Sequence, residues 1–342
     1  MGFETQGGRG GTQAGGALSW FWLVRGYHSE GRRWLEAGLA MDRRVSPEVR
    51  AMALAGVGWL ALQQGNLDRA KGARQEGLEL LEHEAREASE AKLSLLACSG
   101  WMAWQREELG QAQQLFEESL TLSRQMSDIW WLAFSLSNLA LVPQARGEYA
   151  RATELYKESI DLFREQGDKL SLAECLNNLA MVVYSQGDLG RATKLTEEAV
   201  TLQRELGARG DVAIGLCNLG WMALLHSDLG RAADIYGESL SISWDSGQTP
   251  LVQSALEGFA CVAGAKGEAE RAARLWGAAQ VLHEAKDIPR DTDFLAEADA
   301  RIAAVRSGMG EEAWEEAWRK GRAMTLEEAI SYALEGKEVA GG

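Results

Sequence analysis

Residues 176–199, LNNLAMVVYSQGDLGRATKLTEEA, contain the pattern that decides the fold. Apolar residues at helical spacing end at a tight turn centred on Gly187, and a second helix is predicted from Leu189. The same pattern recurs forty residues away in both directions, with its turn at Gly147 upstream and at Ser227 downstream. The stretch therefore predicts one helical hairpin of an internal repeat.

Seven such units appear when the chain is aligned on the turn position. The turn residues are Gly26, Gly65, Glu107, Gly147, Gly187, Ser227 and Gly267, spaced by 39, 42, 40, 40, 40 and 40 residues. Small residues fill three columns, seven residues before each turn and five and twelve residues after it. Because a large side chain would overpack a close helix contact, these columns predict antiparallel helix pairs that stack tightly on one another.

The three columns resemble the small-residue skeleton of the tetratricopeptide repeat, and the long period resembles the variety found in kinesin light chains. The resemblance covers residues 17–285. It implies an all-α, right-handed helical-repeat solenoid, a tetratricopeptide superhelix, of about seven hairpins. Residues 286–342 are expected to form a C-terminal helical cap and tail, with helices at 291–307, 311–322 and 325–334. The glycine-rich residues 1–16 are expected to be a disordered tail.

The start of each second helix also follows a pattern. The residue after the turn is Asn66 in the second unit and an acid in those that follow, where it can cap the helix. In five of the units an arginine follows three residues later, as at Arg69 and Arg231. An acid and an arginine at this spacing are expected to pair on the solvated helix surface.

Composition narrows the classes of partner. The net charge of −15 argues against nucleic acid as a direct partner and favours neutral or basic ligands. The four cysteines are widely spaced, and no signal peptide or long apolar run occurs, so we expect a reduced, cytoplasmic protein that does not enter a membrane.

A second resemblance concerns the end of the chain. Residues 271–285, RAARLWGAAQVLHEA, and 311–334, EEAWEEAWRKGRAMTLEEAISYAL, resemble the C-terminal end of bacterial multidomain regulators. In these regulators a signal-transduction ATPase precedes a tetratricopeptide array, often with a LuxR-type or other DNA-binding domain. The sequence contains no GxxxxGK[ST] phosphate loop and no recognisable helix-turn-helix. The resemblance implies the sensor or partner-binding portion of a regulator; a stand-alone protein derived from one is equally compatible.

The family's groove lies on the first helices, at positions 13, 10, 9, 6, 3 and 2 residues before the turn. Six residues before the turn the series is Trp20, Trp59, Trp101, Leu141, Met181, Trp221 and Cys261. Trp104 and Tyr184 lie three residues before their turns, and Phe134 lies thirteen before its turn. These residues predict an aromatic-lined ligand groove; the alternative is packing against neighbouring second helices. Tryptophans outside this column, including Trp130 and Trp131, are assigned to the core or cap.

Nine residues before the turn, three consecutive units carry asparagine: Asn138, Asn178 and Asn218, with Asn177 adjacent. Long-period members of the family use asparagine here to bind a peptide main chain, because an amide offers both a donor and an acceptor. The alternative is hydrogen bonding between helices. Glu174 and Glu257 add acidic character that favours basic side chains on a ligand. The predicted ligand-binding residues are Trp59, Trp101, Trp104, Phe134, Asn138, Leu141, Glu174, Asn177, Asn178, Met181, Tyr184, Asn218 and Trp221.

Three functions remain open from the sequence. The first is a non-enzymatic module that binds a peptide or protein segment in the concave groove. The second is a sensor of a sugar or aromatic inducer with a tryptophan-lined pocket, and the third is an enzyme on a helical scaffold. The histidines are isolated and no catalytic or metal motif occurs, so we expect no catalytic residue, metal or cofactor. Further possible partners are an upstream ATPase or regulator domain, or a second copy contacted through the apolar N-terminal hairpin.

Overall fold

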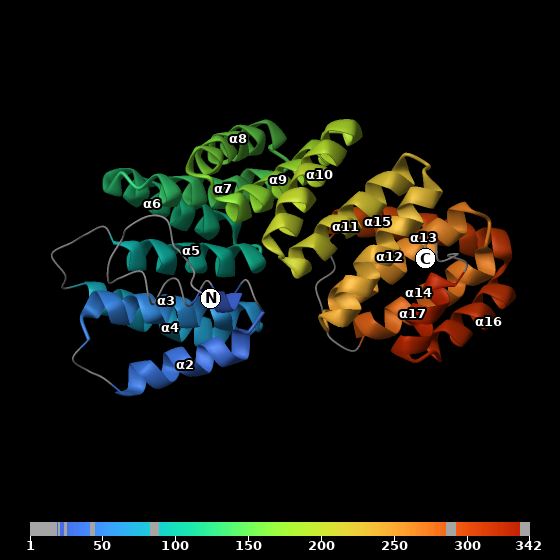
Figure 1. Ribbon diagram of the computed structural model, residues 1–342, viewed down its shortest axis with the longest axis horizontal. Coiled ribbons are helices and arrows are strands. Elements are labelled where there is room, and N and C mark those ends of the chain that lie inside the picture. The colour runs from blue at the N-terminus through green and yellow to red at the C-terminus, as the bar shows by residue number, and fades with distance from the viewer. Residues whose placement is uncertain are drawn as a thin grey trace. The chain divides into compact units, whose positions relative to one another are not determined.

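The computed structural model describes residues 19, 21–23, 26–41, 45–82, 89–284 and 292–335. All regular secondary structure in these residues is helical (Figure 1), which confirms the predicted all-α helical-repeat solenoid. The chain divides into two compact units, residues 1–186 (unit 1) and 187–342 (unit 2). The predicted disordered tail, residues 1–16, lies outside the described residues.

Unit 1 contains three complete hairpins, preceded by one second helix and followed by one first helix. Its helices are α2 (His28–Met41), α3 (Pro47–Gln63), α4 (Leu67–Leu81), α5 (Glu90–Gln105), α6 (Leu109–Met126), α7 (Ile129–Ala145), α8 (Tyr149–Gln166) and α9 (Lys169–Ser185).

Unit 2 continues the repeat and ends with three helices that depart from it. Its helices are α10 (Leu189–Leu206), α11 (Arg209–Leu225), α12 (Leu229–Asp245), α13 (Thr249–Ala265), α14 (Ala269–Glu284), α15 (Thr292–Met309), α16 (Glu311–Arg322) and α17 (Leu326–Leu334). The last three match the predicted cap helices to within two residues. Thr325 and Glu328 form the expected capping box at the start of α17.

The turns confirm the repeat register. All seven predicted turn residues have positive φ, from 59° at Glu107 to 85° at Gly187. Glu107 and Ser227 adopt this conformation although they carry a Cβ, so the turn geometry is imposed by the hairpin at these two sites. A second set of left-handed residues ends the second helices, as at Gly167, where the Asp168 N–H donates to the Phe163 carbonyl at 3.1 Å.

Buried aromatic rings sit against helix backbones in the places that the small-residue columns leave open. The Tyr236 ring of α12 lies between α11 and α13. A Cβ at Gly220 would lie 2.8 Å from this ring, and one at Gly258 would lie closer still. Phe116 makes the same contact against Gly100 in unit 1, and it is fully buried. The two helices and the next hairpin can approach only because these glycines carry no side chain.

The column twelve residues after the turn has a second task that size alone does not predict. In two repeats its serine is fully buried and donates a hydrogen bond to a carbonyl of the first helix in the same hairpin. Ser159 bonds the Ala133 carbonyl at 2.8 Å, and Ser239 bonds the Ala213 carbonyl at 2.9 Å. Each buried hydroxyl thereby has a hydrogen-bond partner inside the packed interface between the two helices.

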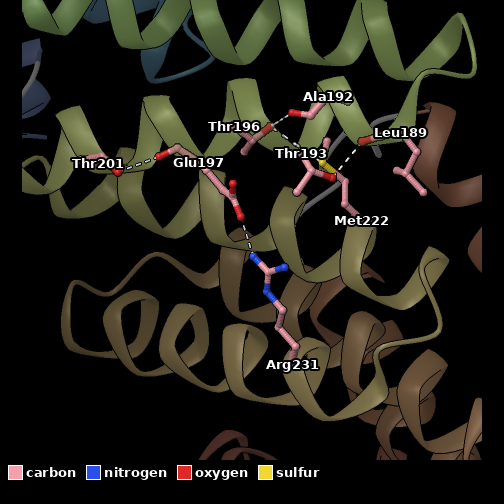
Figure 2. Close-up of polar contacts among 8 residues, drawn as sticks. All are labelled: Leu189, Ala192, Thr193, Thr196, Glu197, Thr201, Met222 and Arg231. Carbon is pink, nitrogen blue, oxygen red and sulfur yellow. Dashed lines mark hydrogen bonds and ion pairs between the residues drawn. The ribbon is translucent and has the colours of Figure 1, made fainter.

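The aspartates among the helix-start acids cap the backbone, whereas Glu108 and Glu148 make no capping hydrogen bond, and the arginines reach further than expected. Asp228 accepts from the backbone N–H of Arg231 at 3.1 Å. The Arg231 guanidinium instead contacts Glu197 on α10 at 2.6 Å, across the gap between successive second helices (Figure 2). Arg69 contacts Glu36 on α2 in the same way, also at 2.6 Å. At Arg231 the expected pairing within one helix is therefore wrong, and the pairs of Arg69 and Arg231 join neighbouring repeats. The expected pairing is present at Arg271, which lies 3.7 Å from the acid that starts its helix, Glu268.

The N-terminal hairpin is described only in part. Of the helix expected at 17–24, residues 19 and 21–23 are described and are helical, and Trp20 is among the residues left out. Helix α2 exposes Trp34, at 59% of its surface, together with Met41. Gly38, at a position expected to be a close contact, is also exposed among the described residues. A partner at this hairpin stays a prediction.

We expect Gly100→Ala to destabilise the chain. A Cβ here would overlap the buried Phe116 ring, and overpacking costs about 1–3 kcal/mol, more than the helix-propensity gain of up to about 1 kcal/mol. Gly110→Ala, in α6 with nothing near its Cβ, should change stability by up to about 1 kcal/mol in the opposite direction. Urea unfolding of both variants measures the difference. Stabilisation by Gly100→Ala would contradict the packing described above.

Candidate functional site

The first helices of successive hairpins in unit 1 lie against one another. Helix α3 contacts α5, α5 contacts α7, and α7 contacts α9. The second helices α4, α6 and α8 pack chiefly against first helices. The first helices are thus more closely spaced than the second helices, and such a stack curves toward its first helices. The surface of α3, α5 and α7 is therefore the inner face of unit 1.

Two tryptophans on this face are held by hydrogen bonds to the next repeat. The indole N–H of Trp59 on α3 donates to the Ser94 hydroxyl on α5 at 3.2 Å. The indole N–H of Trp101 on α5 donates to Asn138 Oδ1 on α7 at 2.9 Å. Both side chains are partly exposed. The bonds fix the orientation of each ring while leaving part of its surface open to solvent.

Further aromatic rings extend this surface. Phe134 on α7 has its centroid 6.5 Å from that of Trp59 and stacks on Trp130 at 5.2 Å. Trp131 meets Phe134 edge-on at 5.6 Å, and Trp101 meets Trp104 edge-on at 5.3 Å. All six rings are partly exposed. We call this set the aromatic face: Trp59, Trp101, Trp104, Trp130, Trp131 and Phe134.

The sequence analysis assigned Trp130 and Trp131 to the core or cap. Trp131 does pack against a buried leucine cluster, and both rings are also partly exposed. Trp130 lies four residues before Phe134, one helical turn away on the same side of α7, and this spacing is the signal that could have placed it in the groove. Its indole N–H donates to Asp168 Oδ2 at 2.7 Å. It is therefore oriented by a bond to the following repeat, like Trp59 and Trp101.

The predicted asparagines differ from one another in their surroundings. Asn138 is buried at 4% exposure, with its oxygen engaged by Trp101. Its Nδ2 atom and the Trp104 indole nitrogen are buried without an acceptor among the described residues. Asn177 and Asn178 on α9 are partly exposed. Asn138 is therefore a hydrogen-bond partner of Trp101 through its oxygen, while its Nδ2 is buried without an acceptor among the described residues.

The other predicted site residues of unit 1 lie on the same first helices but are open to different degrees. Leu141 is buried, Met181 and Tyr184 are partly exposed, and Glu174 is exposed.

In unit 2 the equivalent surface is covered. Trp221 is only 4% exposed, although it occupies the same repeat position as Trp59 and Trp101. The Arg301 guanidinium of α15 lies 5.8 Å above its ring. A Cβ at Gly264, three residues before the last turn, would lie 2.7 Å from Val305 of α15. Helix α15 therefore lies over groove positions of unit 2, and Asn218, in the same unit, is partly exposed.

Chemical groups suited to catalysis are not gathered here. Burial raises the pKa of the Cys98, Cys175 and Cys261 thiols to about 12, which makes them poor nucleophiles. Among the residues that the structure describes, no three His, Cys, Asp or Glu side chains are placed to hold a metal ion. None of the described helices combines the length and apolarity needed to cross a bilayer.

Comparison with known proteins supports the repeat assignment. The tetratricopeptide repeat family matches residues 131–205. A stretch of 83 residues, 24% of the chain, is 36% identical to HTH-type transcriptional regulators of Mycobacterium bovis and Mycobacterium tuberculosis. The match spans 9% of the length of these curated relatives.

Solved structures share the fold at low sequence identity. A Rap protein complexed with competence and sporulation factor superimposes with a TM-score of 0.59 at 11% identity, over 94% of this chain and 100% of that one. A signal transduction ATPase with numerous domains and a tetratricopeptide repeat sensor, from Pyrococcus horikoshii, gives 0.58 at 13%, over 82% of this chain and 43% of its own. At these identities the likeness establishes the fold.

The raised thiol pKa values predict protection from alkylation. At pH 8 a thiol with a pKa near 12 is ionised on the order of one part in ten thousand. Iodoacetamide should therefore modify Cys98, Cys175 and Cys261 slowly in the folded chain and rapidly after urea unfolding. Cys217, whose pKa burial raises to about 11, should react at an intermediate rate. Peptide mass spectrometry identifies the modified sites. Rapid native modification of all four would show that these helices open readily.

The same shifts give stability a pH dependence. The pKa of each of these three thiols in the folded chain lies above the ordinary value of 9.0. Their contribution to the free energy of unfolding is therefore complete below pH 9 and is lost as pH rises toward 12. The urea concentration at the unfolding midpoint should therefore decrease as the pH rises above 9. The decrease should be smaller in a Cys98→Ala variant.

Proposed function

Because the chain is an array of tetratricopeptide repeats, we propose that it is a non-enzymatic binding module that takes a peptide or protein segment on the aromatic face of unit 1. The observation that carries this proposal is the set of six partly exposed rings on α3, α5 and α7. Three of them are fixed by hydrogen bonds to Ser94, Asn138 and Asp168. Fixed aromatic side chains lose little entropy on binding, and such residues dominate the energy of protein interfaces.

We further propose that the module belongs to a bacterial regulator. The support is the 36% identity to HTH-type transcriptional regulators, together with the fold shared with an ATPase that carries a tetratricopeptide repeat sensor. The Rap protein of the same fold was solved with competence and sporulation factor bound. The four free cysteines, three of them buried, suit a reducing compartment such as the cytoplasm.

A second candidate function rests on the corner between Trp101 and Trp104. Their rings meet at an interplanar angle of 69°, which offers a flat sugar or aromatic inducer one ring face and one ring edge. This candidate predicts that a small molecule quenches tryptophan fluorescence saturably and that no display-selected peptide depends on Trp101. Competition between a peptide and the small molecule would place both ligands at these rings.

We expect peptides selected on the full chain from a display library to depend on the aromatic face. Trp59→Ala and Trp101→Ala should each weaken such a peptide about tenfold or more, since a well-packed tryptophan at an interface contributes about 2 kcal/mol. Fluorescence anisotropy measures the affinity, and circular dichroism checks that each variant stays folded at the assay temperature.

The matched control is Trp244→Ala, because Trp244 is exposed on α12, a second helix. Its affinity for the selected peptides should be unchanged. Equal losses at Trp244 and Trp101, or no loss at Trp59 and Trp101 in folded variants, would overturn the assignment of the site.

A further inference from the structure

One face of helix α15 packs against the repeat helices of unit 2. Ala298 and Ile302 are buried, Arg301 lies over the Trp221 ring, and Val305 lies against Gly264. These four residues follow the spacing i, i+3, i+4 and i+7, which is the contact face of an amphipathic helix seated in a groove. Helix α15 is therefore an example, within this chain, of a helix that packs on the surface of the repeats.

The positions that α15 covers are repeat equivalents of the aromatic face. Trp221 lies six residues before its turn, as Trp59 and Trp101 do, and Gly264 lies three residues before its turn, as Trp104 does. The repeat thus presents one kind of surface twice. In unit 2 it is closed by α15, whereas in unit 1 the rings are partly exposed.

We propose that the aromatic face of unit 1 binds an amphipathic α-helix that presents an arginine and aliphatic side chains in the arrangement of α15. This inference rests on the proposed function and specifies its partner class. The partner helix lies across α3, α5 and α7, with its arginine over a tryptophan ring and its aliphatic residues against the neighbouring rings.

The chemistry of the face favours arginine. The indole N–H groups of Trp59, Trp101 and Trp130 are already bonded within the chain, so the contribution left to a ligand comes from the ring surfaces. A guanidinium stacks on an indole face and retains its hydrogen bonds at the ring edge, which the more strongly hydrated lysine ammonium does less well. The net charge of −15 also favours a cation.

Length agrees with this arrangement. A helix of 18 residues, the length of α15, measures about 27 Å at 1.5 Å per residue. First helices in contact are about 10 Å apart, so such a helix spans three of them.

The test uses the α15 sequence itself as the probe. A fluorescein-labelled peptide of residues 292–309 is titrated into the full chain and followed by anisotropy. We expect saturable binding that weakens at least tenfold for the peptide variant Arg301→Gln and for the chain variant Trp59→Ala. The resident α15 holds the unit 2 surface at a high effective concentration, so the added peptide reports on unit 1.

The matched control is the peptide variant Arg306→Gln. Arg306 faces Glu311 and Glu315 of the following helix and does not belong to the contact face of α15, so binding should be unchanged. Equal losses for Arg301→Gln and Arg306→Gln would reduce the interaction to net charge and overturn the inference. If the α15 peptide fails to bind while display-selected peptides bind through Trp59 and Trp101, the helix inference fails and the proposed function stands. If neither kind of peptide binds, the proposed function fails.

Discussion

The close approach of an aromatic ring to bare helix backbone is the contact on which the rest of the structure depends. Tyr236 fits between two first helices because Gly220 and Gly258 leave room for its ring, and Phe116 uses Gly100 in the same way. Each ring fixes the offset between a second helix and the first helices beside it. The ring contact is made in these two repeats, and the small residues of the same column leave room for close helix packing in the others, so equivalent residues of successive first helices are brought to one face.

The polar contacts between repeats are made by the same side chains that shape the candidate site. Trp59 and Trp101 each bond to the next first helix and, in doing so, hold their rings at the surface. The side-chain oxygen of Asn138 accepts the bond from Trp101. The bond that joins two repeats therefore also orients a partly exposed ring on the inner face of unit 1.

At the end of the array, the arginine at the start of the second helix contacts a cap helix. In the last repeat, Arg271 occupies the position from which Arg69 and Arg231 reach a neighbouring repeat, and it donates to carbonyls at the end of α17, including Tyr332 at 3.0 Å and Glu335 at 2.8 Å. Its guanidinium also lies 5.2 Å from the Tyr332 ring centroid. With no further repeat pair to meet, the arginine holds a cap helix by its C-terminus, where a positive charge is favoured. On the inner face of unit 2, α15 covers Trp221 and Gly264.

The sequence by itself determined the period, the turns and the helix pairs, because these depend on residues close together in the chain. Even Glu107 and Ser227 could be placed at left-handed turns from the repeat register alone. Only the tertiary structure decided which tryptophans are open. Trp101 and Trp221 hold the same repeat position, yet one is partly exposed and the other is covered by Arg301, eighty residues further along the chain. Exposure depends on what packs from a distance, and no local pattern records it.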